Sequence, residues 1–254
     1  MNSRQDKSKS KLIIASLYAI TMILAGAYFN YKKPYSPDPV TTPSPIQIIL
    51  WSLFYLPLFF IPLFSNWKIS DMGFSVNFRI LIALIPVVLL CGPIAINFNQ
   101  VYETTLLSSI SEALARTGEE IFFRGFLIFL ITNILKKHDK SIFWAGLLSS
   151  IIFASIHTQV FQANYFHDSS ASKVYLILEK LLNFTVAGGL FAILRIWSHS
   201  IIPGVVAHSI LRGGLFSLPF SLMIYIIIVL VAFILGEDVF HRPDQVLLGS
   251  EETT

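Results

Sequence analysis

Long apolar segments recur along the chain, and their length limits what it can fold into. A helix that crosses the hydrocarbon core of a bilayer needs about 20 predominantly apolar residues, and the sequence offers about eight segments of roughly that size. They cover approximately residues 12–30, 46–64, 78–96, 105–135, 141–158, 174–196, 200–217 and 219–235. This pattern predicts an all-α, polytopic membrane protein of about eight transmembrane helices.

The composition agrees with a membrane location. Of the 254 residues, 54% are hydrophobic and only 13% are charged, and the mean hydropathy of +0.69 is far from that of a soluble domain. The net charge of +3 is modest. Basic residues cluster at the ends of apolar segments, where they set topology rather than bind nucleic acid. We therefore expect membrane lipid as a partner and no nucleic acid.

The chain is expected to form one transmembrane domain over residues 12–235. A basic cytoplasmic segment, residues 1–11, precedes it, and a polar, mobile tail, residues 236–254, follows it. Basic residues favour the cytoplasmic side, which predicts that both termini are cytoplasmic. A bacterial plasma membrane is favoured over an endomembrane as the location of this multi-pass protein. The fourth apolar segment, 105–135, is longer than a bilayer requires, so we expect it to begin outside the hydrocarbon core or to break between Leu107 and Thr117.

Ionisable residues gather within this fourth segment. Glu119 and Glu120 are adjacent, and Arg124 follows Glu120 by four residues. Charged side chains at membrane depth cost roughly 2.5–3.5 kcal/mol each on insertion scales and usually mark function. Because residues four apart share a helix face, Glu120 and Arg124 can form an ion pair, which Arg116 can also serve. Glu119 is rotated by about 100° from this pair and is free to face a cavity.

Two histidines lie in other apolar helices. His157 is one turn after Phe153 in the fifth segment, and His208 lies in a helix that starts near Pro203. A glutamate and two histidines are the parts of a proton-transfer site with Glu119 as base, or of a zinc site. The zinc ligands would be Glu119, His157 and His208. No HExxH spacing supports zinc, so a site that requires no cofactor is the favoured prediction.

Two further considerations bear on this site. The same charges suit a neutral polar network that only pins helices together. At 1.5 Å per residue, Glu119 and His157 lie about 25 and 24 Å along their helices, whereas His208 lies only about 12 Å from the start of its helix. Helix lengths alone therefore predict a difference in depth between His208 and the other two residues.

The ionisable residues together resemble the motifs of a known family. In order, the motifs are Glu119-Glu120-x-x-x-Arg124, Phe153-x-x-x-His157 and His208. They are similar to the three motifs of the CAAX-protease and bacteriocin-processing family, also called the Abi family of intramembrane proteases. The motifs fall within about 105–217, and the resemblance extends over roughly 70–217 to include Met72-Gly73-Phe74. It implies an endopeptidase that cuts a membrane-associated peptide or a prenylated protein.

The resemblance also implies a role for each residue. Glu119 would be the base that activates water, and His157 would help to hold that water or share its proton. Glu120 and Arg124 would support the arrangement. His208 would donate a hydrogen bond to the oxyanion. The family has been described both as metalloprotease and as glutamate-dependent protease, so zinc is the alternative cofactor.

One position departs from the family pattern. The third motif usually has asparagine or aspartate four residues after its histidine, and here that position is Arg212. Arg212 could itself donate to an oxyanion, or it could pair with Glu119 and quench it as a base. The second outcome would make the chain a catalytically silent member that binds a peptide or confers immunity to a bacteriocin. Asn183 could supply an amide instead. A proton-coupled transporter is a further alternative, but no sequence repeat or pair of broken helices supports it.

Overall fold

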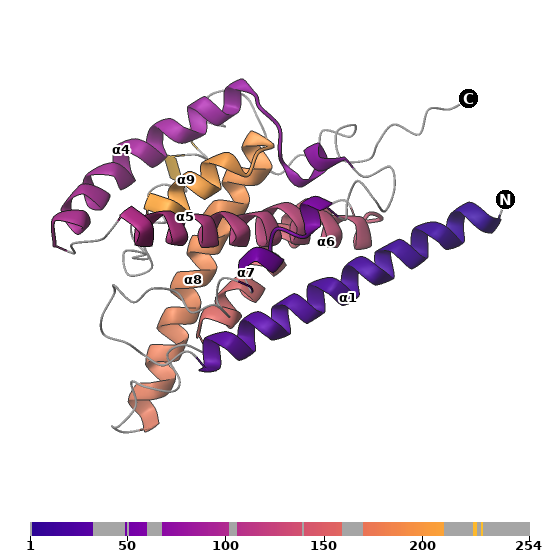
Figure 1. Ribbon diagram of the computed structural model, residues 1–254, viewed down its shortest axis with the longest axis horizontal. Coiled ribbons are helices and arrows are strands. Elements are labelled where there is room, and N and C mark those ends of the chain that lie inside the picture. Colours follow the sequence, from indigo (N-terminus) through magenta and orange to yellow (C-terminus); the bar gives the residue numbers. More distant parts are fainter. Residues whose placement is uncertain are drawn as a thin grey trace.

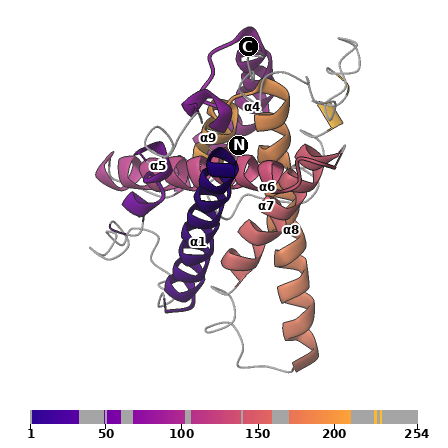
Figure 2. The ribbon, with the colours of Figure 1, turned by 90° about the vertical axis from the view of Figure 1, so that its right-hand side faces the viewer.

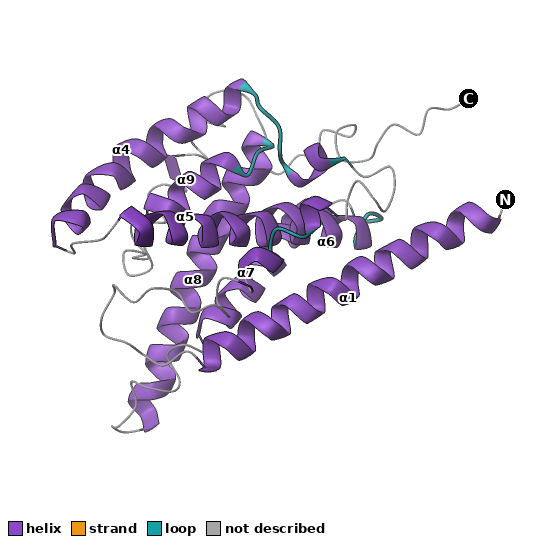
Figure 3. Ribbon diagram, in the orientation of Figure 1, coloured by secondary structure: helices purple, strands orange, loops and turns teal. Residues whose placement is uncertain are grey.

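A computed structural model shows an all-helical chain (Figure 3). It describes residues 2–32, 49, 51–59, 68–101, 106–138, 140–158, 170–210, 226, 227 and 230. In these residues no strand forms, and the one β-type contact is an isolated antiparallel bridge between Phe74 and Ser200. The all-α prediction is thus confirmed for the described part of the chain.

The helices follow the predicted apolar segments. In chain order they are α1 (Asn2–Lys32), the 3₁₀ turn η1 (Ile69–Met72), α4 (Phe78–Val101), α5 (Leu106–Glu120), the π-helix η2 (Ile121–Leu127), α6 (Ile128–Ile134), α7 (Ser141–Thr158), α8 (Ser170–Ser198) and α9 (Ile202–Ile210). The segments predicted at 12–30, 78–96, 141–158 and 174–196 correspond to α1, α4, α7 and α8. About half of the segment at 46–64, most of 219–235 and the end of 200–217 lie outside the described residues.

The fourth segment differs from its prediction. α5 runs unbroken from Leu106 to Glu120, so no break lies between Leu107 and Thr117. The irregularity comes directly after the glutamates, where the seven residues Ile121–Leu127 form π turns before α6 continues. All seven are buried. Such turns within α-helices are rare and are frequent at functional sites.

Two of the described helices are long and apolar enough to cross a membrane. They are Ser10–Tyr28 within α1 and Ile177–Ser198 within α8. Shorter apolar helices cover Phe78–Leu89 and Ser141–His157. Length and composition therefore support embedding in a membrane, and the count of eight transmembrane helices stays a prediction.

The continuous rod formed by α5, η2 and α6 crosses the centre of the molecule (Figure 1). After a quarter turn, α1 and α8 are seen to run past this rod at a steep angle (Figure 2). α7 packs along α8, and α9 packs against α4, α8 and α5. Side chains at the α5–η2 junction can therefore meet helices from much later in the chain.

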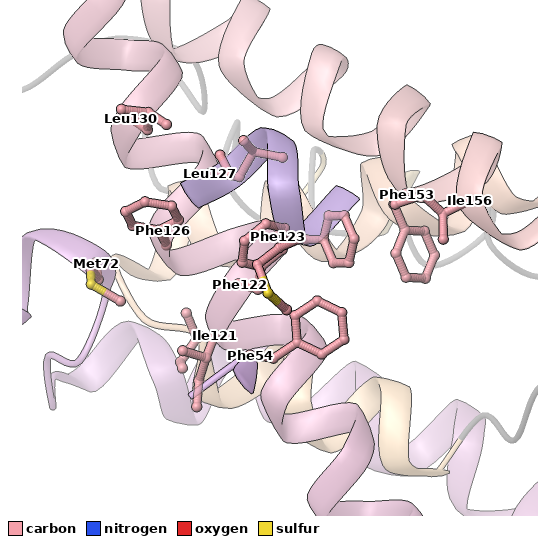
Figure 4. Packing of buried hydrophobic residues seen from close by; sticks show 13 residues of the cluster. Phe54, Met72, Ile121, Phe122, Phe123, Phe126, Leu127, Leu130, Phe153 and Ile156 are labelled. Carbon is pink, nitrogen blue, oxygen red and sulfur yellow. The ribbon is translucent and has the colours of Figure 1, made fainter. Parts of the chain in front are cut away.

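The hydrophobic core surrounds η2 and is rich in aromatic side chains (Figure 4). The ring centroids of Phe122 and Phe123 lie 5.0 Å apart in an edge-to-face arrangement. Phe54 packs on Phe122 at 5.2 Å, and Phe153 of α7 packs on Phe123 at 5.3 Å. Edge-to-face contacts of this kind are worth about 0.5–1.5 kcal/mol each beyond the area they bury. The aromatic core thus fixes η2 between residues 51–59 and α7.

The segment before α4 is tied to the end of α8 by a buried arginine. Arg195 donates hydrogen bonds to the backbone carbonyls of Asp71 (2.9 Å) and Met72 (3.2 Å). Gly73 has a φ of 91°, and a Cβ at this position would collide with the Arg195 side chain. Burial raises the pKa of the Asp71 carboxyl, against the lowering effect of the hydrogen bond from the Lys68 N–H. Both its conformation and its neighbour restrict position 73 to glycine.

Candidate active site

The adjacent glutamates at the α5–η2 junction face different neighbours. Oε2 of Glu119 lies 4.0 Å from Nε2 of His157 and 3.7 Å from Nε2 of His208. The Glu119 side chain is 18% exposed, whereas that of Glu120 is fully buried. Successive helical residues point about 100° apart, which accounts for this division. Glu119 is the carboxylate that a small molecule can reach.

The depth difference expected for His208 does not separate it from Glu119 and His157. α9 is a short helix of nine residues, and it packs against α5. Its histidine therefore meets Glu119 from the side. The two histidines are far from Glu119 in the sequence, yet Nε2 of each faces the same Glu119 oxygen, Oε2.

His208 is held at both its ring and its backbone. Its Nδ1 lies 2.9 Å from Oε1 of Glu120, and its ring stacks on Phe191 of α8 with centroids 5.0 Å apart. Its backbone carbonyl accepts a hydrogen bond of 2.7 Å from Nη1 of Arg116. The sequence predicts that Arg116 serves the Glu120–Arg124 pair, and the structure shows it bound to the backbone of α9 at His208.

The ion pair predicted between Glu120 and Arg124 is present. Nε of Arg124 lies 3.6 Å from Oε2 of Glu120, and both side chains are buried. The guanidinium carbon also lies over three aromatic rings, 4.2 Å from the centroid of Phe153, 5.3 Å from Phe191 and 5.7 Å from Phe123. Desolvated cation–π contacts are worth about 2 kcal/mol. Within the described residues no acceptor hydrogen-bonds to the guanidinium, so the Glu120 charge and the aromatic faces hold it.

His157 presents a defined edge to Glu119. Its Nδ1 lies 2.8 Å from the backbone carbonyl oxygen of Phe153. Because a carbonyl only accepts hydrogen bonds, Nδ1 carries a proton. The ring lies between Phe153 and Phe184, with centroid separations of 4.3 and 5.3 Å. Nε2 is the nitrogen that faces Glu119, and in a neutral ring with the proton on Nδ1 it accepts hydrogen bonds.

Zinc was the alternative predicted for Glu119, His157 and His208. The nitrogen and oxygen ligands of a tetrahedral zinc lie about 2.0–2.2 Å from the ion. In the part of the chain that the structure describes, no group of three or more His, Cys, Asp or Glu side chains is arranged to hold a metal ion. Zinc binding by these three side chains stays a prediction, and we assign it no step.

Other predicted residues fall away from this cluster. Arg212 lies outside the described residues, so its effect on an oxyanion site stays a prediction. Asn183 lies half-buried in α8. None of the contacts described above involves its amide, and its role as a substitute donor also stays a prediction.

Four residues near the cluster were not predicted. Phe184 and Phe191 of α8 stack on the two histidines. The backbones of Gly188 and Gly204 lie against Arg124 and Glu120. In the sequence these residues differ in no way from other apolar helix positions, and only the packing of α8 and α9 against the rod singles them out.

The fold and the cluster define a class of protein, an all-helical one with a carboxylate–imidazole site enclosed among apolar helices. The sequence pattern of the family described as "Type II CAAX prenyl endopeptidase Rce1-like" matches residues 81–213. This region is just over half of the chain and contains the whole cluster, and the chain belongs to this family. The resemblance predicted from the three motifs is thereby confirmed. No curated protein and no solved structure matches the chain.

Proposed function

We propose that the protein is an intramembrane endopeptidase that cuts a membrane-associated peptide or a prenylated protein. Its family supports proteolysis as the reaction class. The observation that carries the proposed mechanism is the position of Glu119, whose partly exposed carboxylate faces Nε2 of two histidines. A carboxylate in such a site can act as general base toward water.

In the proposed reaction Glu119 takes a proton from water while the water oxygen bonds to the peptide carbonyl carbon. The π electrons of the carbonyl move to its oxygen. Nε2 of His157 accepts a hydrogen bond from the same water and orients it. When the tetrahedral intermediate collapses, the C–N bond breaks and the leaving nitrogen takes the proton from Glu119. One water is consumed, and a carboxylic acid and an amine are released.

In this proposal His208 stabilises the oxyanion. It does so from Nε2, which must carry a proton. Nδ1 then either accepts a hydrogen bond from a protonated Glu120 carboxyl or, in a doubly protonated ring, donates one to the Glu120 carboxylate. A preorganised donor is worth up to about 4 kcal/mol to the transition state. Glu120 and Arg124 support the ring without contacting substrate.

The experiment uses the full chain, purified in detergent, and a quenched fluorescent peptide with an S-farnesyl cysteine followed by three residues. We expect wild-type cleavage, and a fall in kcat of about 10²–10⁴-fold in Glu119→Gln, the range typical of a lost general base. Glu179→Gln, the same change on α8 outside the cluster, is the matched control and should retain full activity. Unchanged turnover of Glu119→Gln would overturn the proposed function.

The same cleavage assay tests whether the reaction requires zinc. A mechanism without zinc predicts that 1,10-phenanthroline leaves kcat unchanged. It also predicts that the purified active enzyme contains less than one zinc per chain by elemental analysis. Loss of activity on chelation, restored by added zinc, would favour Glu119, His157 and His208 as metal ligands instead.

A further inference from the structure

Two glycines face the buried Glu120–Arg124 pair from later helices. A Cβ at Gly204 of α9 would lie 3.0 Å from Oε2 of Glu120. A Cβ at Gly188 of α8 would lie 3.1 Å from Nη2 of Arg124. Both separations are tighter than nine in ten contacts of real Cβ atoms, so the neighbouring atom would have to move by a few tenths of an ångström. The absence of a side chain at these two positions therefore leaves the space that the Glu120 carboxylate and the Arg124 guanidinium occupy.

Gly204 connects this packing to the candidate active site. It lies four residues before His208 on α9, so the two share one helix face. The carboxylate of Glu120 lies across that face, with Oε2 against the Gly204 backbone and Oε1 on Nδ1 of His208. The two oxygens belong to one rigid planar group. A side chain at position 204 that displaces Oε2 would therefore also move Oε1, the atom that contacts Nδ1 of the His208 ring.

Glu120 has little space into which it could retreat. Its side chain is fully buried, and its Oε2 faces the buried guanidinium of Arg124. A Cβ at Gly204 would also lie 3.8 Å from the Cβ of Phe191, the residue on which the His208 ring stacks. That second separation is ordinary van der Waals contact, so a displaced carboxylate would disturb the ring through the contact of Oε1 with Nδ1.

Gly188 faces the Arg124 guanidinium as Gly204 faces the Glu120 carboxylate. A Cβ there would lie 3.2 Å from both Cα and Cβ of Ser150 on α7. The Ser150 backbone cannot move away without separating α7 from α8, whereas Nη2 of Arg124 is the far end of a flexible side chain. A side chain at position 188 therefore displaces the Arg124 guanidinium, which is the ion-pair partner of Glu120.

We propose that Gly204, supported by Gly188, is a positioning residue: its bare backbone sets the place of the Glu120 carboxylate and thereby turns Nε2 of His208 toward Glu119. The proposal rests on the proposed function for its turnover measurement. A second measurement, on the ring itself, is independent of catalysis.

The test compares Gly204→Ala and Gly188→Ala with Gly189→Ala. Position 189 is a matched control, because a Cβ there meets nothing within 4 Å. Each protein is labelled with ¹⁵N-histidine in detergent, and the His208 ring nitrogens are assigned from the resonances that His208→Gln removes. The farnesylated peptide then gives kcat and KM for each variant. Alanine is a better helix former than glycine, so weakened helices would not explain a loss of activity.

We expect Gly204→Ala to shift the His208 ring resonances and to lower kcat about tenfold with KM unchanged, because catalytic groups tolerate displacements of only about 0.5 Å. Gly188→Ala should act in the same direction and serves alone if Gly204→Ala fails to fold. Gly189→Ala should match wild type. Unshifted His208 resonances in the folded 204 and 188 variants, or equal effects in the 189 variant, would overturn the proposal. An active Glu119→Gln enzyme would overturn the proposed function. The resonance measurement would still test whether Gly204 positions the His208 ring.

Discussion

Glu119 and Glu120 are neighbours in sequence, yet the fold gives their carboxylates different surroundings. Glu120 has no exposed surface and has Arg124 and His208 as partners, whereas Glu119 retains 18% exposure and lies farther from His208, at 3.7 Å against 2.9 Å. A buried charge is tolerated only when it is paired. The cation over the aromatic rings is therefore what allows Glu120 to lie beside His208.

Removing that cation tests this dependence. Arg124→Met leaves a buried carboxylate without its partner, and breaking a buried pair in this way costs about 3–5 kcal/mol. We expect the free energy of unfolding in mixed micelles to fall by that amount. The double variant Glu120→Gln with Arg124→Met removes both charges and should be more stable than Arg124→Met alone. A double variant that loses the sum of the two single effects would show that the two side chains do not stabilise each other.

Sequence spacing predicted some of these contacts and could not predict others. Glu120 and Arg124 lie one turn apart, so helix geometry alone indicates their pairing. The hydrogen bond from Arg116 joins residues 92 positions apart in the chain. Such a contact depends on how α9 packs on α5, which no local pattern encodes. The glycines at 188 and 204 were missed for the same reason.

At the scale of helices, hydropathy located most elements but missed the π-helix. The predicted segment 141–158 coincides with α7, because Lys136, Lys137 and Lys140 mark the polar boundary before it. Within Ile121–Leu127, Arg124 is the only charged residue. A run that is apolar on all sides shows no change of period when an α-helix widens into π turns. The break was therefore predicted in α5, where polar residues interrupt the run.

The tie between η1 and the end of α8 can be tested at Gly73. Gly73→Ala places a Cβ against Arg195 and forces a left-handed conformation that costs roughly 1–2 kcal/mol for other residues. The N–H of Ile201 donates to the Gly73 carbonyl at 2.9 Å, so its hydrogen exchange should accelerate. The N–H of Val205, which donates to the Ile201 carbonyl, should keep its protection. Equal exchange of Ile201 in both proteins would show that position 73 does not hold this connection.

At the scale of the whole molecule, the sequence established membrane embedding more firmly than the number of crossings. Length and hydropathy identify Ser10–Tyr28 and Ile177–Ser198 directly. The rod of α5, η2 and α6 contains the buried charges of Glu120 and Arg124, and α9 is described as far as Ile210. Neither element is among the described helices that length and hydropathy identify as candidate membrane spans. We propose one transmembrane domain over 12–235 with both termini cytoplasmic.

This topology can be measured with single cysteines, because Cys91 is the only native one. In a Cys91→Ser background, S8C and S250C should react with a membrane-impermeant maleimide only from the cytoplasmic side of sealed vesicles. S36C, in the segment between the first two predicted helices, should react only from the opposite side. Labelling of S8C and S250C from opposite sides would require an odd number of crossings and would rule out eight.

The π-helix after the glutamates also limits how the gene can vary. A π turn accommodates one residue more than an α turn over the same stretch of backbone. A gene that lost one codon between Ile121 and Leu127 would still encode α5 and α6 with their outer faces unchanged. The loss would be local, because the widened turn that separates Glu120 from the phenylalanines after it would close. A shortened chain of this kind would keep the architecture of its family and lose the geometry of the site.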